Sequence, residues 1–349
     1  MSTKKILFPT NIDRWTKPVV TKLREISLNL PQYDFYSFSS PENEEDMSKG
    51  VKLWKKKHIK RINYIDLLTK KYDVTHITST GKRIYLAVVS QKLMNKKNKC
   101  VFTIPIELKP GDRYFDGLKK MIERADCNVA ISQSVANTMN KYLNKEADYI
   151  IGNGVDVDYF NYSIVQKEKI NKEKNRIVLF VGFMSQRKRP DIFIELAKRM
   201  KDIQFVMIGG IHNQEDKLKY IGKVNAQNNI KYLGLCSKET VRLYMAKSSV
   251  LIFPSEYEGM SSTVLEASAM GMKILARPVS SLPEVIEVGT NGWLYNIEDL
   301  DMWKSKIQEI LSWNKLKQEL EMEKSRDYII ENFSWQSVAD KYSKVYNEL

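Results

Sequence analysis

The chain has 349 residues, and at about 150 residues per domain this length predicts two domains. Its content of 43% hydrophobic and 28% charged residues excludes a disordered protein, and no apolar run approaches the roughly 18 residues of a membrane-spanning helix. The formal net charge is +14, of which residues 1–175 carry +12 and residues 176–349 carry +2. We therefore expect the first half to face something anionic, with nucleic acid, acidic lipid and a phosphorylated acceptor as candidates.

The three cysteines, Cys100, Cys127 and Cys236, lie far apart and form no CxxC pair. This spacing argues against a disulfide framework and a zinc ribbon and favours a reducing cytoplasm. The short apolar stretch near the start, Ile6–Phe8, runs directly into Pro9, which is typical of a buried strand rather than of a signal peptide.

Short apolar runs alternate with segments of helical periodicity along the whole chain. The predicted strands are Lys5–Pro9, Asp34–Ser39, Val74–Ser79, Cys100–Pro105, Asn128–Ser132 and Tyr149–Ile151, followed by Ile177–Gly182, Gln204–Gly209, Ile230–Gly234, Val250–Pro254, Lys273–Ala276 and Trp293–Tyr295. Between them, segments such as Pro190–Met200 and Lys238–Lys247 have the 3.6-residue period of helices. This alternation, occurring twice, predicts two α/β domains with doubly wound parallel sheets. The polar, charged stretch Tyr162–Asn175 predicts the connection between them.

The most informative stretch is Pro254–Gly271, PSEYEGMSSTVLEASAMG, which follows an apolar strand. Gly259 offers a flexible backbone, and the hydroxyl residues Ser261–Thr263 can cap a helix that runs through Val264–Met270. The open N–H groups and the dipole of a helix start favour a phosphate or a diphosphate. Ligands of open α/β sheets bind at the carboxyl ends of the strands, where this turn is predicted to lie.

Two carboxylates frame this turn, Glu258 in the loop and Glu266 about one helical turn inside the helix. A carboxylate accepts hydrogen bonds from two neighbouring hydroxyl groups, so each suits the diol of a sugar or a ribose. An isolated pair at this spacing is more often a helix-start charge and a solvated helix position. In this context we favour the binding role.

The stretch resembles the E-x7-E signature of the family 4 retaining glycosyltransferases, the glycosyl transferases group 1, which have the GT-B fold. Further segments resemble the family in order and spacing, namely Ala125–Met139, Ile151–Phe160, Val181–Met200, Phe205–Gly210, Ile230–Ser255 and Phe333–Trp335. The resemblance implies two doubly wound Rossmann-like domains facing a central cleft. It implies an acceptor-binding domain at 1–165, a nucleotide-sugar-binding domain at 176–334, and a final helix at 335–349 that packs back on the first.

The same resemblance implies transfer of a sugar from a nucleotide-diphosphate donor with retention of configuration, a hexosyltransferase-like reaction of EC class 2.4. Lys188 matches the lysine on the donor diphosphate, Glu258 the carboxylate near the transferred sugar, and Glu266 the carboxylate on the ribose, which makes Lys188 and Glu258 the candidate catalytic residues. The candidate donor-binding residues are Arg187, Lys188, Gly209, Gly259, Met260, Ser261, Ser262 and Glu266. No cofactor is implied beyond a UDP- or GDP-sugar as substrate. No metal is implied either, because Asp156 and Asp158 fall in an interdomain motif of the family.

Three consecutive cations at 187–189 oppose the dipole of the helix that follows, which predicts an anion to balance them. The chain also departs from the family pattern. Phe183 stands where the family often has arginine, the loop Pro9–Pro18 has no glycine pair, and Thr103–Leu108 lacks the family's histidine, with Glu107 as the nearest polar group. His76, at the end of a predicted strand, is expected to be structural.

Lys49–Lys71 carries nine Lys or Arg and one acid, and a helical stripe is formed by Val51, Trp54, His58, Ile62, Ile65 and Leu68. A core-packed helix explains the stripe, whereas the one-sided charge suits anionic lipid headgroups. No RNA- or DNA-binding signature supports a nucleic-acid partner.

We therefore expect a cytoplasmic glycosyltransferase, peripheral on the inner membrane face, that acts on a glycan, a lipid-linked or another acceptor. The alternatives are a GT-B nucleotide-sugar epimerase or hydrolase, and a non-catalytic basic binding protein on the same scaffold. The retained Lys188, Glu258 and Glu266 argue against the last of these.

Overall fold

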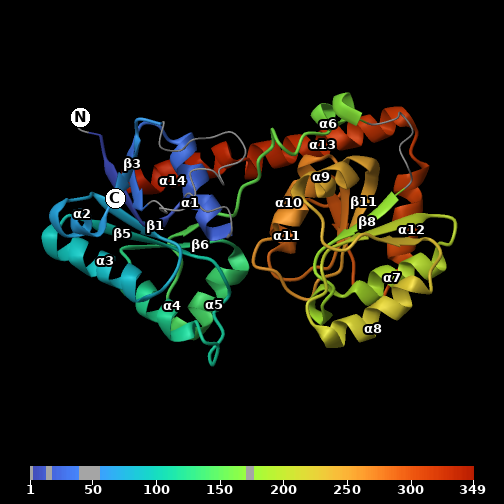
Figure 1. The fold of residues 1–349 in the computed structure, drawn as a ribbon, viewed down its shortest axis with the longest axis horizontal. Helices are drawn as coiled ribbons and strands as arrows, with labels where there is room; N and C mark the ends of the chain where they lie inside the picture. The colour runs from blue at the N-terminus through green and yellow to red at the C-terminus, as the bar shows by residue number, and fades with distance from the viewer. Residues whose placement is uncertain (1–2, 13–17, 39–55, 170–176) are drawn as a thin grey trace. The chain divides into compact units, whose positions relative to one another are not determined.

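The structure is a computed structural model that describes residues 3–12, 18–38, 56–169 and 177–349. It divides into two compact units, the first made of Met1–Gly154 with Trp335–Leu349 and the second of Val155–Ser334. Each unit has one sheet, and all pairs of strands within the two sheets are parallel in the described residues (Figure 1). The predicted pair of doubly wound α/β domains is confirmed.

The first unit is built on a seven-stranded sheet with the order β3-β2-β1-β4-β5-β6-β7. Its strands are β1 (Lys5–Asn11), β2 (Asp34–Phe38), β3 (Ile59–Ile62), β4 (Val74–Ile77), β5 (Lys99–Ile104), β6 (Cys127–Ala130) and β7 (Tyr149–Ile150). Its helices are α1 (Pro18–Asn29), α2 (Tyr64–Thr69), α3 (Lys82–Met94), α4 (Phe115–Ile122), α5 (Gln133–Leu143) and α14 (Trp335–Glu348). Because β1 and β4 are neighbours, the direction of the connections reverses between them, which is where such sheets place their ligands.

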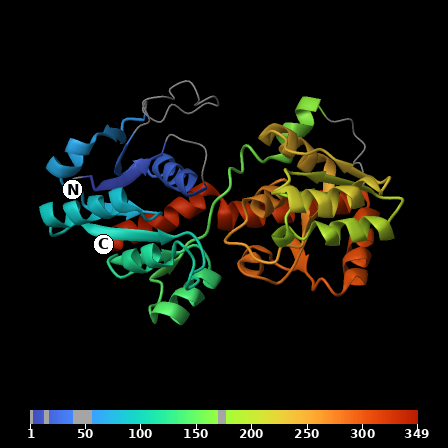
Figure 2. The same cartoon turned by 60° about the horizontal axis from the view of Figure 1, so that its bottom comes forward.

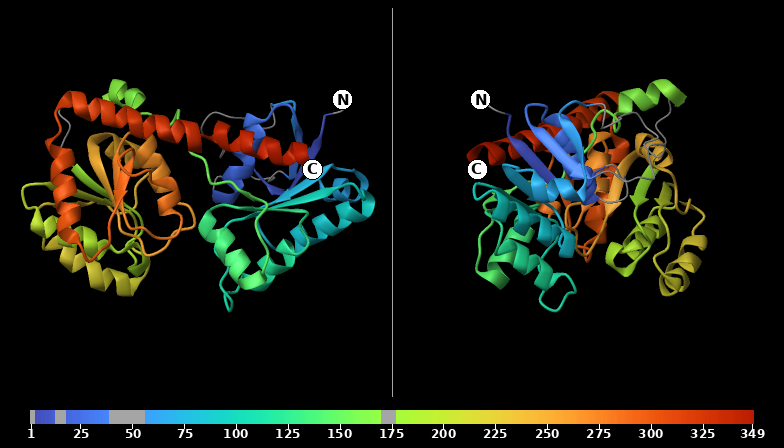
Figure 3. Two further views of the ribbon diagram at one scale, coloured as in Figure 1. Left: turned by 180° about the vertical axis from the view of Figure 1, so that it is seen from behind. Right: turned by 60° about the vertical axis from the view of Figure 1, so that its left-hand side comes forward.

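Alternate side chains of the central strand β1 point to opposite faces of this sheet. Ile6 and Phe8 belong to the core formed with α1 and α14, whereas Leu7 packs in a core that includes Leu67 of α2 and Ala87 of α3. Figure 1 shows α3, α4 and α5 along one face of the sheet, and the view from behind shows the terminal helix α14 along the other (Figure 3). With both faces covered, the central strands are mostly apolar, as the sequence pattern indicated.

His76 of β4 is fully buried between the sheet and α14. Its Nδ1 lies 2.6 Å from the Tyr346 hydroxyl oxygen and its Nε2 lies 2.8 Å from Thr103 Oγ1. Burial, and to a lesser extent the charge of Lys22, lowers the pKa of His76 to about 3, so that the ring is neutral. Both ring nitrogens are thus used to join β4 and β5 to the terminal helix, which is the structural role predicted for this residue.

The second unit is built on a six-stranded sheet with the order β10-β9-β8-β11-β12-β13. Its strands are β8 (Ile177–Val181), β9 (Gln204–Ile208), β10 (Ile230–Tyr232), β11 (Ser248–Phe253), β12 (Lys273–Ala276) and β13 (Gly292–Leu294). Its helices are α6 (Tyr162–Lys169), the 3-10 helix η2 (Gln186–Lys188), α7 (Pro190–Arg199), α8 (Gln214–Asn225), α9 (Lys238–Lys247), α10 (Ser262–Ala269), α11 (Leu282–Val285), α12 (Leu300–Ser312) and α13 (Lys315–Phe333). None of the helices in the described ranges is both long and apolar enough to cross a membrane.

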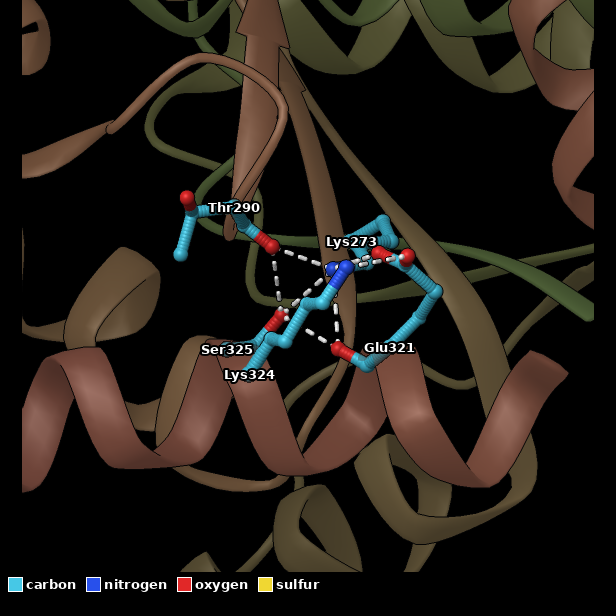
Figure 4. A network of polar contacts seen from close by, with 5 residues as sticks. All are labelled: Lys273, Thr290, Glu321, Lys324 and Ser325. Carbon is cyan, nitrogen blue, oxygen red and sulfur yellow. Dashed lines mark hydrogen bonds and ion pairs between the residues drawn. The ribbon is translucent and has the colours of Figure 1, made fainter. Parts of the chain in front are cut away.

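A buried polar network fastens α13 to the beginning of β12 (Figure 4). The ammonium group of Lys273 donates to the Glu321 carbonyl oxygen at 2.8 Å, to Ser325 Oγ at 3.0 Å and to the Thr290 carbonyl oxygen, and it pairs with Glu321 Oε2 at 2.9 Å. Burial lowers the pKa of Lys273, and the Glu321 carboxylate opposes this effect. Lys324 holds the other carboxylate oxygen of Glu321 at 3.1 Å. The network lies at the amino end of its strand, away from the edge that binds ligands, so its role is to hold α13.

The segment at 162–175, which the sequence predicted as the connection between the domains, begins with α6 and belongs to the second unit. Tyr162 and Val165 pack in that unit's core, because both side chains fall on the inner side of the short helix. The two units divide between Gly154 and Val155 rather than after residue 165. Residues 170–176 lie outside the described residues.

The helical stripe predicted over Lys49–Lys71 is wrong for residues 56–63 and agrees with the structure only over α2, Tyr64–Thr69. Ile59–Ile62 forms strand β3, which pairs with β2 from Phe35↔Ile59 to Phe38↔Ile62. Helix α2 begins only at Tyr64, where Asn63 and Asp66 form a capping box. Val51 and Trp54 lie outside the described residues. Pairing with a neighbouring strand therefore outweighs the apparent helical period of this segment.

Candidate active site

The candidate site lies where β8 and β11 meet in the second unit. These two strands are neighbours and their connections leave in opposite directions, the arrangement in which doubly wound sheets bind ligands at the carboxyl ends. One loop, residues 182–189, follows β8, and the other, residues 254–261, follows β11. The backbone N–H of Glu256 donates to the carbonyl oxygen of Arg187 at 2.9 Å. The sheet thus brings two segments together that lie some 70 residues apart in the chain.

A cluster of two cations and one carboxylate joins these loops. Lys188 Nζ donates to Glu258 Oε1 at 2.6 Å, and Arg187 Nη1 donates to the same oxygen at 2.7 Å and to the Tyr257 carbonyl oxygen at 3.0 Å. The side chains of Lys188 and Glu258 are only 12% and 10% exposed. Burial lowers the pKa of Lys188, and the adjacent Glu258 opposes this shift. Two positive charges on one carboxylate leave a net positive charge of one, so the cluster can still attract an anion.

The three consecutive cations at 187–189 were predicted to need an anion to balance them. Carboxylates of the same unit provide that balance. Arg187 and Lys188 contact Glu258, while Arg189 forms a bidentate pair with Asp191 at 2.7–3.1 Å and lies 3.8 Å from Glu256. Each cation therefore has a carboxylate of the same unit beside it. The cations also precede the helix that they were thought to begin, because η2 spans Gln186–Lys188 and α7 starts at Pro190.

The start of α10 faces the same edge of the sheet. Ser261 is the N-cap, and its buried side-chain oxygen accepts a hydrogen bond from the Val264 N–H at 3.4 Å. Ser262 is the exposed first residue of the helix, and Met260 packs partly buried against the core of the unit. Gly259 lies half-buried in the preceding loop. The backbone N–H groups of a first helical turn have no partner within the helix and suit a phosphate oxygen.

Glu266 lies one turn inside α10 and differs from the other charged groups of the site. In the described part of the chain its carboxylate has no hydrogen bond or ion pair, and it is half-buried. Burial raises the pKa of Glu266 to about 7, and the charge of Lys238 at the start of α9 partly opposes the shift. A buried acceptor of this kind is costly unless a ligand supplies donors.

Gly209, predicted to bind the donor, follows β9 where two loops approach closely. Its φ is +145°, and a Cβ at this position would lie 1.9 Å from the Gly182 carbonyl oxygen, so only glycine fits. Its N–H donates to the Gly234 carbonyl oxygen at 2.8 Å. Gly209 therefore shapes the rim of the site through the backbone. Phe183, which stands where an arginine was expected, is 53% exposed, and its ring edge lies where a Cβ on Gly210 would be.

Two residues of this region were not singled out from the sequence. Ser255 follows β11 by two residues, is fully buried, and its hydroxyl has no partner in the described structure. Lys238 lies with its ammonium group 4.8 Å from the centre of the Tyr159 ring. Its positive charge acts to lower the pKa of Glu266. The Pro-Ser pair directly after the strand and the Ser-Lys start of α9 were the available signals. Each is too common in sequences to mark a site alone.

The first unit has a cavity of about 640 Å³ at its own switch point. It lies beside the carboxyl ends of β1, β2 and β4, and its polar lining residues are Thr10, Asn11, Thr78, Ser79, Lys82 and Arg83. Glu107, the nearest polar group in the segment that lacks a histidine, instead accepts a hydrogen bond from the Ser134 hydroxyl at 2.5 Å. Among the described residues no group of three or more His, Cys, Asp or Glu is placed to hold a metal ion.

Two doubly wound units of this kind make up a GT-B protein, and the cation cluster with a helix start beside it is what a nucleoside diphosphate requires. The family model for glycosyl transferases group 1 matches residues 163–345. The chain belongs to this family, and it is a retaining glycosyltransferase that uses a nucleotide-sugar donor. The predicted family, fold and reaction class are confirmed.

The chain is similar to proteins of bacteria and archaea over most of its length. It is 27% identical over 305 residues to an uncharacterised 41.2 kDa protein in the cps region of Klebsiella pneumoniae, with 79% of each chain covered. It is 26% identical over 347 residues to an uncharacterised glycosyltransferase of Methanocaldococcus jannaschii, with 95% of this chain and 92% of the relative covered. HepE of Anabaena, solved in complex with UDP and glucose, matches with a TM-score of 0.70 at 15% identity and full coverage of both chains, which shows a shared fold.

Proposed function

We propose that the protein transfers a hexose from a UDP-sugar to a hydroxyl group of a glycan or a lipid-linked acceptor. The donor would bind the second unit and the acceptor the first. The observation that carries this proposal is the cluster of Arg187, Lys188 and Glu258 at the junction of β8 and β11, with the unpartnered Glu266 one helical turn into α10. The structural likeness to HepE, which was solved with UDP and glucose, favours uridine over guanosine in the donor.

Lys188 and Arg187 would hold the diphosphate together with the N–H groups at the start of α10, around Gly259, Met260, Ser261 and Ser262. When the bond between the anomeric carbon and the diphosphate oxygen breaks, negative charge grows on the leaving group. A fixed ammonium group that is only 12% exposed stabilises that charge more than a solvated one would. Lys188 therefore acts on the leaving group.

Glu258 would position the transferred sugar. Its Oε1 is occupied by both cations, while Oε2 has no partner in the described residues and can accept a hydrogen bond from a sugar hydroxyl. Glu266 would accept hydrogen bonds from the two ribose hydroxyls, which supplies the donors that it lacks.

The acceptor would bind at the cavity of the first unit and supply a hydroxyl group. Its oxygen forms the new bond to the anomeric carbon, its proton passes to the leaving diphosphate, and the nucleoside diphosphate leaves with the bonding electrons. Thr10, Asn11, Thr78 and Ser79 line that cavity with neutral donors and acceptors, which suit a hydroxyl-rich acceptor. No metal is needed to balance this step.

We place the enzyme in the cytoplasm, at the inner face of the membrane, where a lipid-linked acceptor is presented. All three cysteines are free, and burial raises the pKa of both Cys100 and Cys127 to about 12, so these thiols stay protonated. A chain with buried free thiols suits a reducing compartment.

The test is release of nucleoside diphosphate from a panel of UDP- and GDP-sugars, with and without oligosaccharide and polyprenyl-phosphate-linked acceptors. We expect a UDP-sugar to turn over and the product to retain the anomeric configuration by NMR. Turnover of the donor to free sugar that no acceptor accelerates would favour a hydrolase. Conversion to an isomeric nucleotide-sugar would favour an epimerase.

A further inference from the structure

The outward side of helices α2 and α3 in the first unit is both apolar and basic. Ile65 and Leu68 of α2 are 69% and 66% exposed, and Leu86 and Leu93 of α3 are 63% and 79% exposed. The residues of each pair are three and seven positions apart, so each pair shares one side of its helix. Both helices lie on the same face of the sheet, the face that comes forward in Figure 2.

These four side chains are exposed and do not contribute to the core of the first unit. The inner sides of the two helices already contribute Leu67, Ala87 and Val88 to the interior. The helices are also joined at their surface, because Arg83 Nη1 donates to the Tyr64 hydroxyl at 3.3 Å. Single exposed aliphatic residues are ordinary, but four on two joined helices are typical of an interaction surface.

The surrounding charge is almost entirely positive. Residues 56–99 contain twelve Lys or Arg and two acidic residues. Both acids are used by the fold: Asp66 caps α2 and pairs with Lys70 at 2.8 Å, and Asp73 accepts a hydrogen bond from the Lys5 N–H at 2.8 Å. In contrast, the exposed lysines that begin α3 or directly follow α2 and α3 have no ion pair in the described residues, namely Lys71, Lys82, Lys96 and Lys97. We call these four lysines with Ile65, Leu68, Leu86 and Leu93 the α2–α3 surface.

We propose that the α2–α3 surface docks on an anionic lipid bilayer, with its aliphatic side chains in the headgroup–acyl boundary and its lysines on the headgroups. The inference rests on the proposed membrane location of the enzyme and specifies how it attaches. It keeps Ile65, Leu68 and Lys71 of the segment 49–71 that the sequence indicated and extends the contact to α3. Lys60 of strand β3 is left out because it pairs with Asp34 of β2 at 2.7 Å.

The chemistry of the surface separates this partner from two others. A second copy of the chain would bring the same unpaired lysines against each other, and like charges repel. A nucleic acid would satisfy the lysines but not the aliphatic side chains, since bases stack on aromatic faces. The aromatic rings of these two helices already have partners in the protein: Tyr64 packs on Phe38 with ring centres 4.8 Å apart, and Tyr85 is approached by Lys120 and Arg124 at 4.4 and 5.1 Å from its centre. A bilayer satisfies both the charge and the apolar area.

The test is flotation of the full chain with vesicles of phosphatidylcholine alone or with phosphatidylglycerol, at low and high salt. We expect binding to the anionic vesicles only, and its loss at high salt, where the Debye length falls to a few ångströms. The variant K71Q/K82Q/K96Q/K97Q should lose roughly 5-fold in partition per lysine, and L86Q/L93Q at least ~5-fold in total. The matched control K201Q/K217Q/K223Q/K231Q removes the same charge from exposed positions of the second unit and should keep vesicle binding.

Absence of binding to anionic vesicles at low salt overturns the proposal, and so does an equal loss in the control variant. Tighter binding to an RNA oligonucleotide than to vesicles, lost in the first variant, would assign the surface to nucleic acid instead. Circular dichroism and thermal unfolding check that the first unit of each α2–α3 surface variant is folded, since the substituted residues lie in that unit. Vesicle binding without sugar transfer would contradict the proposed function alone, and transfer to a soluble acceptor without vesicle binding would contradict the α2–α3 surface alone.

Discussion

The two sheets share one strand order around their centres, and the loops at those centres differ in chemistry. In the second unit the loops after β8 and β11 carry Arg187, Lys188 and Glu258 in direct contact. In the first unit the end of β1 and the loop after β4 contribute Asn11, Thr78 and other uncharged residues to a cavity of about 640 Å³, and its two cations, Lys82 and Arg83, come from the start of α3. The topology provides equivalent positions in the two units, whereas the side chains give these positions different chemistry. On that ground we propose that the diphosphate binds the second unit and the hydroxyl acceptor the first.

A second contrast concerns two titratable groups, His76, which is fully buried, and Glu266, which is half-buried. His76 in the first unit is buried and has a hydrogen-bond partner on each ring nitrogen, whereas Glu266 in the second unit has none among the described residues. Burial favours the neutral form of both groups: it lowers the pKa of His76 to about 3 and raises the pKa of Glu266 to about 7. A satisfied buried group holds the fold together, and an unsatisfied one at the edge of a sheet is a candidate for a ligand.

The largest effect is expected from removing the ammonium group of Lys188, which lies where the loops after β8 and β11 meet. Lys188→Ala should lower kcat by roughly 10²–10³-fold, because the leaving diphosphate loses a fixed positive charge that matters most in the transition state. Steady-state kinetics with a UDP-sugar measure it, with Lys198→Ala on the exposed side of α7 as the matched control. A rise in KM with unchanged kcat would show that Lys188 binds substrate and transition state equally, contrary to its assigned role.

Removing the unpartnered carboxylate should have the next largest effect. Glu266→Ala should weaken UDP-sugar binding by roughly 10–100-fold, because hydrogen bonds from the ribose hydroxyls to a charged acceptor are lost. Isothermal titration calorimetry measures the change, and Glu195→Ala on α7, which removes an exposed carboxylate, is the control. Equal affinities of the variant and the wild type would remove Glu266 from the donor site.

Because the pKa of Glu266 is raised to about 7, we expect the affinity for the donor to depend on pH near neutrality. The ribose hydroxyls of the donor hydrogen-bond to the ionised carboxylate, so Glu266 has a lower pKa in the complex than in the free protein. The affinity for the donor is therefore highest above pH 7 and falls as the pH drops through 7. Between pH 8 and pH 6 the wild type should lose about 10-fold in affinity for UDP-glucose. Glu266→Gln should bind more weakly with a flat profile. A flat profile in the wild type would show that the carboxylate does not contact the donor.

The smallest effect is expected in the first unit. Asn11→Ala should raise the acceptor KM by roughly 2–10-fold, the range of one neutral hydrogen bond, and leave the affinity for UDP-sugar unchanged. The two constants are measured on the same variant, so each serves as the control of the other. A change in donor affinity without a change in acceptor KM would reverse the assignment of the two units.

Much of the fold follows from local pattern. The twelve predicted strands coincide with β1, β2 and β4–β13, because each is a short apolar run that a covered parallel sheet requires. Strand β3 was missed because Ile59–Ile62 lies among lysines and has the spacing of a helical stripe. Its identity comes from hydrogen bonds to β2, which no local pattern records.

The candidate site divides in the same way. The sequence by itself determined that Lys188, Glu258 and Glu266 are present, that Ser261 can cap a helix, and that a glycine-containing turn and a helix start follow an apolar strand, because these features depend on residues a few positions apart. Only the tertiary structure decided that Lys188 contacts Glu258, that Arg189 pairs with Asp191, and that Glu266 has no hydrogen-bond or ion-pair partner among the residues the structure describes. Contacts over 70 residues depend on the order of strands in the sheet, and burial depends on every element packed around a side chain. Both are properties of the assembled fold, and for that reason the charge balance of the site could not be read from its motif.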